Sequence, residues 1–255
     1  MRQLLTLILL FAAIQRASAV DAISNEVRTA LIPVLANSGV PGVAGSRWLT
    51  TLAVYNASTD LIALLPCGIP NRCPPEVFMF NPRTTERNPP LGFTTAGVNG
   101  RLIYYTAKDA PSLFFKLTVF DASRNGRPAE IPVVTEDRFR TSVLEMLDIP
   151  LDDSSRTTLR IYDVDDRDGA SVTVRMFDER ERIIGEQNIR FTSSGYAHPG
   201  QFPVAPAFIV LPLSFEPRAD SRVRIEIEPA TEGLRFWAFV SVVENATSSV
   251  TIYSP

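Results

Sequence analysis

One seven-residue segment occurs twice in this chain, first at residues 50–56 (TTLAVYN) and again at residues 157–163 (TTLRIYD). In both copies, apolar side chains recur at every second position, and a turn-forming Asn or Asp follows a tyrosine. Alternation of this kind predicts a β-strand with one buried face. Two such copies indicate that a strand-rich unit has been duplicated.

A second pair of similar segments supports the duplication. Residues 30–35 (ALIPVL) resemble residues 129–134 (AEIPVV), so we expect each unit to begin with an Ile-Pro-Val strand. The chain has 255 residues, which exceeds the comfortable size of a single core. The sequence therefore predicts two domains, residues 20–127 and residues 128–255.

Strand patterns fill much of the remaining chain. Residues 222–228 alternate charged and apolar side chains, which predicts one solvated and one buried face. Residues 236–243 are apolar on both faces, as in a covered central strand, whereas residues 139–147 fit either a strand or a short helix. Further strands are predicted at 101–105, 113–120, 171–177 and 183–191. Because strands are short and turns frequent, the predicted fold is all-β: two tandem antiparallel β-sandwiches.

The first 19 residues have the pattern of a secretory signal peptide. Arg2 precedes an apolar stretch, residues 4–14, and small residues at 17–19 form the cleavage site. The apolar stretch is too short to span a bilayer, and no later segment has the pattern of a membrane span. Cleavage removes Arg2 and Arg16, which leaves 23 of the 25 basic residues against 28 acidic ones, a net charge of −5. This charge argues against nucleic acid as a partner. We expect a soluble exported protein, either periplasmic or extracellular.

Cys67 and Cys73 are the only cysteines. In an exported protein such a close pair predicts a disulfide, whereas a metal site would lack any nearby histidine. A ring this small contributes roughly 2 kcal/mol of stability, so it would hold a local loop only. The cysteines lie in a proline-rich, irregular insertion, residues 66–99, and loops of this length usually have a purpose. We predict a contact surface at residues 67–99.

Four carboxylates follow the second copy of the repeated strand: Asp163, Asp165, Asp166 and Asp168. Oxygen ligands of this kind suit calcium. The helix-loop-helix calcium pattern is not met, because Arg167 occupies a ligand position and Val174 stands where a glutamate belongs. The alternative interpretation is a solvated hairpin turn, in which Asp and Gly are favoured for backbone reasons. Melting temperatures measured with calcium and with a chelator distinguish the two.

His198 is the only histidine, so acid–base or nucleophilic catalysis requires either this residue or carboxylates alone. Ser193 and Ser194 lie near it in the sequence, but the Gly-x-Ser-x-Gly pattern of a nucleophilic serine is absent. The surrounding residues resemble a loop, and an ordinary loop histidine is the simpler interpretation.

Aromatic residues offer a possible sugar-stacking platform, formed by Trp48, Tyr104, Tyr105, Phe236 and Trp237. They lie inside strand patterns, where aromatic residues more often belong to the core. Asn56 and Asn245 each begin an Asn-x-Ser/Thr glycosylation pattern. Both also end a predicted strand, where Asn favours a turn.

Cys67, the two copies of the repeated strand and above all residues 236–247 (FWAFVSVVENAT) resemble an uncharacterised group of exported bacterial proteins. Those proteins are built from immunoglobulin-like repeats. The resemblance covers nearly the whole chain after the signal peptide and depends on strand and turn signatures. It implies the fold and the compartment, and it implies no catalytic residues.

These patterns include no arrangement of residues that specifies a reaction. We therefore expect a non-catalytic binding or structural module, without a cofactor, that acts at or outside the cell surface on an extracellular protein or glycan. The alternatives are an extracellular hydrolase, which would use His198 or the acidic turn, and a calcium-dependent carbohydrate-binding protein.

Overall fold

The computed structural model describes residues 27–36, 39–65, 77–91, 99–124, 127–195, 202–213 and 222–255. Strands dominate these residues, all sheets are antiparallel, and the helical elements in them are three-residue 3-10 turns. The all-β prediction is thus confirmed. In the described ranges, no helix is long and apolar enough to cross a membrane.

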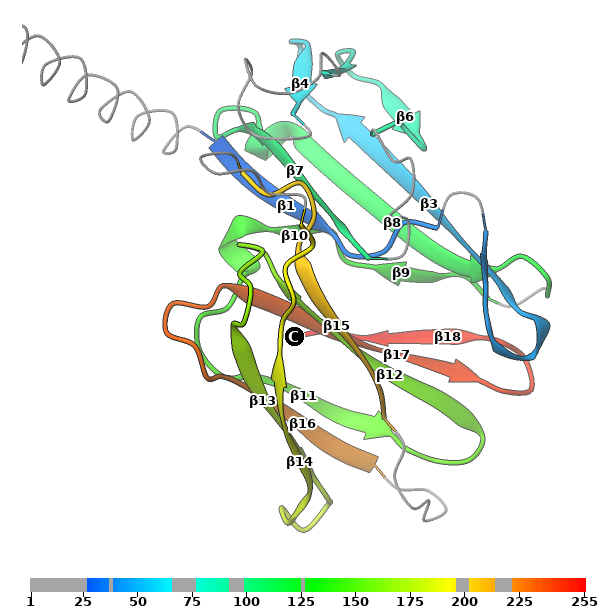
Figure 1. Cartoon of the computed structure of the whole chain (residues 1–255). Helices are drawn as coiled ribbons and strands as arrows, with labels where there is room; N and C mark the ends of the chain where they lie inside the picture. The colour runs from blue at the N-terminus through cyan, green and yellow to red at the C-terminus, as the bar shows by residue number, and fades with distance from the viewer. Residues whose placement is uncertain are drawn as a thin grey trace, which may run out of the picture.

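The first half of the chain forms two main sheets and a small hairpin (Figure 1). One sheet has the order β10-β1-β7, comprising β1 (Val27–Ile32), β7 (Arg101–Thr106) and β10 (Val134–Thr135). The other has the order β2-β3-β8-β9, with β6 also paired to β3; it comprises β2 (Val40–Pro41), β3 (Arg47–Asn56), β6 (Thr85–Arg87), β8 (Leu113–Asp121) and β9 (Ala129–Ile131). The hairpin pairs β4 (Ile62–Leu64) with β5 (Phe78–Phe80).

The second half forms two four-stranded sheets around one core. The first has the order β11-β16-β13-β14: β11 (Leu144–Pro150), β16 (Arg222–Pro229), β13 (Ser171–Phe177) and β14 (Ile183–Arg190). The second has the order β15-β12-β17-β18: β15 (Ala207–Leu213), β12 (Ser155–Asp163), β17 (Phe236–Glu244) and β18 (Val250–Tyr253). Alternate residues of each sheet, such as Ile225 and Leu159, are buried in the shared core.

The two copies of the repeated segment occupy matching places in their sheets. β3 contains the first copy and pairs with β8, while β12 contains the second and pairs with β17. Leu52 lies opposite Leu117, and the corresponding Leu159 lies opposite Val240. Both leucines are buried, so the alternation predicted from the sequence sets the same inward face in both copies.

The Ile-Pro-Val segments do not occupy matching places. β1 pairs with β7, whereas β9 pairs with β8 and β10 pairs with β1, so residues 129–135 belong to the sheets of the first half. By pairing, the counterpart of β9 is β18, which lies beside β17. The second half therefore does not begin with an Ile-Pro-Val strand. The two segments are similar because proline follows a short apolar strand in each, and such composition does not specify a partner strand.

Two other expectations are corrected by the strand pairing. The segment 66–99 is not irregular throughout, since β5 and β6 lie within it. The acidic turn is not a hairpin tip, because β12 and β13 belong to different sheets, and β13 pairs with β14 and β16 instead. In addition, the ambiguous residues 139–147 lead into a strand, β11, after a 3-10 turn at Glu136–Arg138.

The two halves pack against each other. The core of the first half includes Tyr162, Trp237 and Phe239, which project from the outer face of β12 and β17. The Tyr162 hydroxyl donates a hydrogen bond to the Pro33 carbonyl at 2.6 Å. Figure 1 shows β9 of the first half beside β18 of the second. The junction is therefore an extension of the first core.

Candidate functional site

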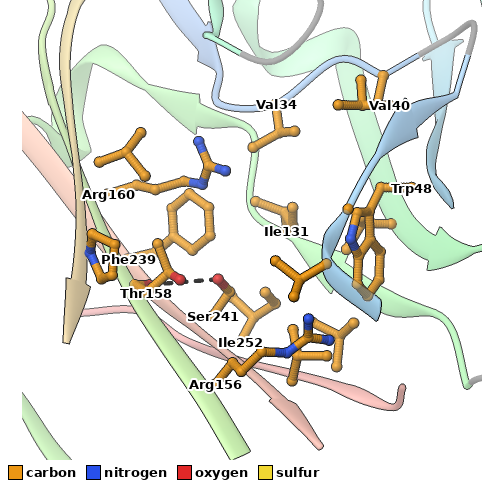
Figure 2. A pocket seen from close by; sticks show the side chains of 18 of the residues that line it. Val34, Val40, Trp48, Ile131, Arg156, Thr158, Arg160, Phe239, Ser241 and Ile252 are labelled. Atoms are coloured by element: carbon orange, nitrogen blue, oxygen red, sulfur yellow. Dashed lines mark hydrogen bonds between the residues drawn. The ribbon is translucent and has the colours of Figure 1, made fainter. Parts of the chain in front are cut away.

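A cavity of about 370 Å³ lies at the junction of the two halves. Apolar residues of the first half, including Val34, Val40, Trp48 and Ile131, form one wall (Figure 2). The opposite wall is the outer face of β12 and β17. The volume falls in the lower part of the range that is typical of small-molecule sites, roughly 300–1,000 Å³.

Strand alternation determines which side chains reach the cavity. In β12, Leu159 and Ile161 face the core of the second half, so Arg156, Thr158 and Arg160 project from the other face into the cavity wall. β17 contributes its outward residues in the same way: Phe239, Ser241 and Val243. Figure 2 shows the two arginines on the wall opposite Trp48 and Val40.

Arg156 and Arg160 have no ion pair with any carboxylate in the described part of the chain. Nε of Arg156 and Nη1 of Arg160 are buried, and neither has a hydrogen-bond partner among the described residues. Burial raises the pKa of Tyr162 to about 12, and the nearby Arg160 partly offsets this rise. Leaving a buried donor unsatisfied costs about 1–3 kcal/mol, and more when the group is charged.

Other arginines of the second half provide the contrast, since each of these forms at least one ion pair with a carboxylate: Arg175, Arg182, Arg222, Arg224 and Arg235. Arg175 and Arg224 each contact three glutamates. Arg156 and Arg160 instead line the cavity without a carboxylate partner among the described residues.

The sequence repeat contains the signal that identifies these arginines. In the first copy, Leu49 and Ala53 stand at the positions that correspond to Arg156 and Arg160. The same outward face of the same strand thus carries arginines in the second copy only. The strand pattern that the two copies share does not reveal these positions, at which the charge of the two copies differs.

The described residues that line the cavity include no Asp, Glu, His or Cys. Their polar groups are the two arginines, the hydroxyls of Thr158 and Ser241, and the indole of Trp48. The Ser241 hydroxyl donates to the Thr158 backbone carbonyl at 3.5 Å. General acid–base catalysis needs a group that exchanges a proton near the working pH, and none of these side chains provides one.

A neighbouring cavity of about 430 Å³ shares Arg156 and Thr158 with the first and includes Asp152 and Asp153. A hydrogen bond from the Ser154 hydroxyl lowers the pKa of Asp152, so this carboxylate is ionised at neutral pH. Negative charge therefore lies near Arg156, while Arg160 lines only the first of these two cavities.

Asp163, the first of the proposed calcium ligands, is fully buried. Its Oδ1 accepts the backbone N–H of Asp165 at 3.1 Å, and its Oδ2 accepts that of Arg167 at 2.9 Å. Asn56 occupies the corresponding place in the first copy and accepts the backbone N–H of Ser58 at 2.9 Å. Asp163 therefore stabilises a turn, as Asn56 does. Burial raises the pKa of Asp163, because charge is disfavoured away from water.

The other three carboxylates of the acidic turn each accept hydrogen bonds from other groups of the chain. Asp165 accepts hydrogen bonds from Arg235, Asp166 accepts them from Ser193 and Ser194, and Asp168 accepts the Ser193 backbone N–H. Among the described residues, no group of three or more His, Cys, Asp or Glu side chains is arranged to hold a metal ion. The calcium site remains a prediction without a converging set of ligands.

Most of the proposed aromatic platform belongs to the core. Tyr104, Tyr105, Phe236 and Trp237 are at most 3% exposed, whereas Trp48 is half-buried and lines the cavity. Burial raises the pKa of Tyr104, and it raises that of Tyr105 to about 12. Only Trp48 of the five is placed to contact a ligand in the cavity.

The two glycosylation patterns differ in accessibility. The Asn56 side chain is fully buried and donates to the carbonyls of Asp60 and Phe80 at 2.8 and 2.9 Å. Asn245 is exposed and donates to the Asp153 carbonyl at 3.0 Å. Both side chains stabilise turns, as the simpler interpretation predicts.

Cys67, Cys73 and His198 lie outside the described residues, as does most of the predicted contact surface. The predictions for these residues therefore stay predictions. Comparisons with known protein families, with curated proteins and with solved structures find no match to this chain.

The role of Asp163 leads to a stability prediction. We expect Asp163→Ala to lower the free energy of unfolding by about 1–3 kcal/mol, because two buried backbone N–H groups lose their acceptor. Asp163→Asn should cost less, since one acceptor remains, as in Asn56. Because the pKa of Asp163 is raised in the folded protein, its contribution to the free energy of unfolding falls as pH rises from the ordinary pKa of aspartate to the raised pKa. Asp163→Asn should lack this pH dependence. Urea denaturation between pH 3 and pH 7 measures both effects, and equal losses for Ala and Asn would contradict the turn-stabilising role.

Proposed function

We propose that this chain is an exported, non-catalytic binding protein built from two tandem immunoglobulin-like β-sandwich units. The matching registers of β3 with β8 and of β12 with β17 support the tandem units. The pattern of residues 1–19 supports export. The units meet after β10, because residues 129–135 pair with strands of the first half.

The single observation that carries this proposal is the chemistry of the junction cavity. Its described lining is apolar apart from two arginines, two hydroxyls and the indole of Trp48, and among these residues none could act as a general acid or base at neutral pH. A concave, apolar site with a few polar groups is the usual form of a ligand-binding site. The cavity is therefore suited to hold a ligand without transforming it.

Expression with residues 1–19 present, followed by mass measurement of the secreted or periplasmic product, tests the export step. We expect the mature chain to begin at Val20. The purified product is then tested on panels of ester, peptide and glycoside substrates, together with a His198→Ala variant. We expect no turnover by either protein. Turnover that disappears in His198→Ala would replace this proposal with an enzyme.

A further inference from the structure

We propose that the junction cavity binds an amphipathic carboxylate, a saturated fatty acid being the simplest case. The hydrocarbon tail lies against the apolar wall, and the carboxylate pairs with Arg160, with Arg156 as a second and weaker contact. This inference rests on the proposed binding function and specifies the ligand class.

The charge of the cavity selects an anion. Arg160 contributes a buried nitrogen that lacks a hydrogen-bond partner within the described residues, and the lining includes no carboxylate to neutralise it. Charged groups in protein interiors are normally paired, and a guanidinium binds a carboxylate through charge-assisted hydrogen bonds. A ligand carboxylate supplies the partner that the described residues do not supply.

The remaining lining selects a hydrocarbon tail. Val34, Val40, Trp48, Ile131 and Phe239 come from both halves, and they enclose the space next to the arginines (Figure 2). Sugars and other strongly polar ligands would lose their hydrogen bonds to water against such walls. A ligand with one anionic end and an apolar body satisfies both parts of the lining.

The repeat provides a separate argument that these arginines are not required for folding. The outward face of β3 has Leu49 and Ala53 where β12 has Arg156 and Arg160, although both strands pair with their partners in the same register. The fold therefore forms this face without arginine, and a role in ligand binding accounts for both arginines in the second copy.

The test uses the purified mature chain and the series of saturated fatty acids from hexanoate to hexadecanoate, below their critical micelle concentrations. Binding is measured by calorimetry and by tryptophan fluorescence. The chain has two tryptophans, of which Trp48 lines the cavity and Trp237 is buried. We expect saturable binding with one ligand per chain, a fluorescence change that is lost in Trp48→Phe, and at least tenfold weaker binding of the matching primary alcohol.

The variants return the second copy to the residues of the first. We expect Arg160→Ala to weaken binding of the best fatty acid at least tenfold and Arg156→Leu to weaken it less, because Asp152 and Asp153 lie near Arg156. Arg190→Ala is the matched control, since Arg190 is exposed on β14, and it should leave the affinity unchanged. Thermal melting of each variant verifies that the protein is folded.

The inference is overturned if no fatty acid of the series binds saturably, if the alcohol binds as tightly as the acid, or if Arg160→Ala and Arg190→Ala have equal effects. Selective binding of a peptide with an apolar C-terminus in place of the fatty acid would also overturn it. Each of these results overturns the ligand class and leaves the proposed binding function in place. Turnover that depends on His198 would instead overturn the binding function, and it would not test which ligand the cavity binds.

Discussion

Trp237→Ala is expected to lower the free energy of unfolding by about 3–5 kcal/mol. Trp237 is only 1% exposed and lies between the two halves. Its ring centroid lies 5.5 Å from that of Phe239 and 6.4 Å from that of Tyr162. Truncation removes a large apolar side chain and leaves a void that strands on both sides of the junction prevent from closing, so the upper part of the range is expected.

Urea denaturation followed by far-UV circular dichroism measures this loss. Trp48→Ala is the matched control: it removes the same side chain from a half-buried position on the cavity wall, where space already exists. The control should lose clearly less stability than Trp237→Ala. A loss below about 1 kcal/mol for Trp237→Ala would show that the junction contributes little to folding.

The positions of the strands could be predicted from the sequence because alternation is a local property. Residues 171–177 match β13, and residues 222–228 differ from β16 only by Pro229. Val172 and Val174 of β13 and the apolar residues at alternate positions of β16 are buried, and Met176 is partly buried. The short strands β5 and β6 were missed because three residues are too few to show a period, and their neighbours include prolines.

Strand partners could not be predicted in the same way. The turn after β12 has the composition of a hairpin, yet it connects strands of two different sheets, and within it Asp163 and Asp166 accept hydrogen bonds from nearby backbone groups. Likewise, Ile131 pairs beside Leu117 in the first half, although its segment resembles residues 30–35. A hydrophobic pattern specifies which face of a strand is buried, but not which strand lies next to it.

The cavity could not be predicted from the sequence, for a related reason. It is formed by residues of both halves, and no single segment shows that Trp48 faces Arg160 across a space. The candidates chosen from the sequence were local clusters instead. The local signal is the replacement of Leu49 and Ala53 in the first copy by Arg156 and Arg160 in the second. This signal becomes informative once the outward face of β12 is known to meet the first half.

The repeat allows a matched test of whether the two halves fold together. Leu52 and Leu159 occupy the same position in the two copies, and both are buried. We expect Leu52→Ala and Leu159→Ala each to lower the free energy of unfolding by about 2–5 kcal/mol. Leu147→Ala, at a 64% exposed position, is the control and should change stability by about 0.5 kcal/mol or less.

The decisive result is whether the two variants shift one shared unfolding transition or two separate transitions. The first core includes Tyr162 and Trp237 from the second half, so neither half can unfold without exposing apolar surface of the other. Both variants should therefore shift one shared transition, seen at the same urea concentration by tryptophan fluorescence and by circular dichroism. If each variant instead shifted a separate transition, the halves would be independent. The junction cavity would then open and close without unfolding either unit, because its two walls belong to different halves.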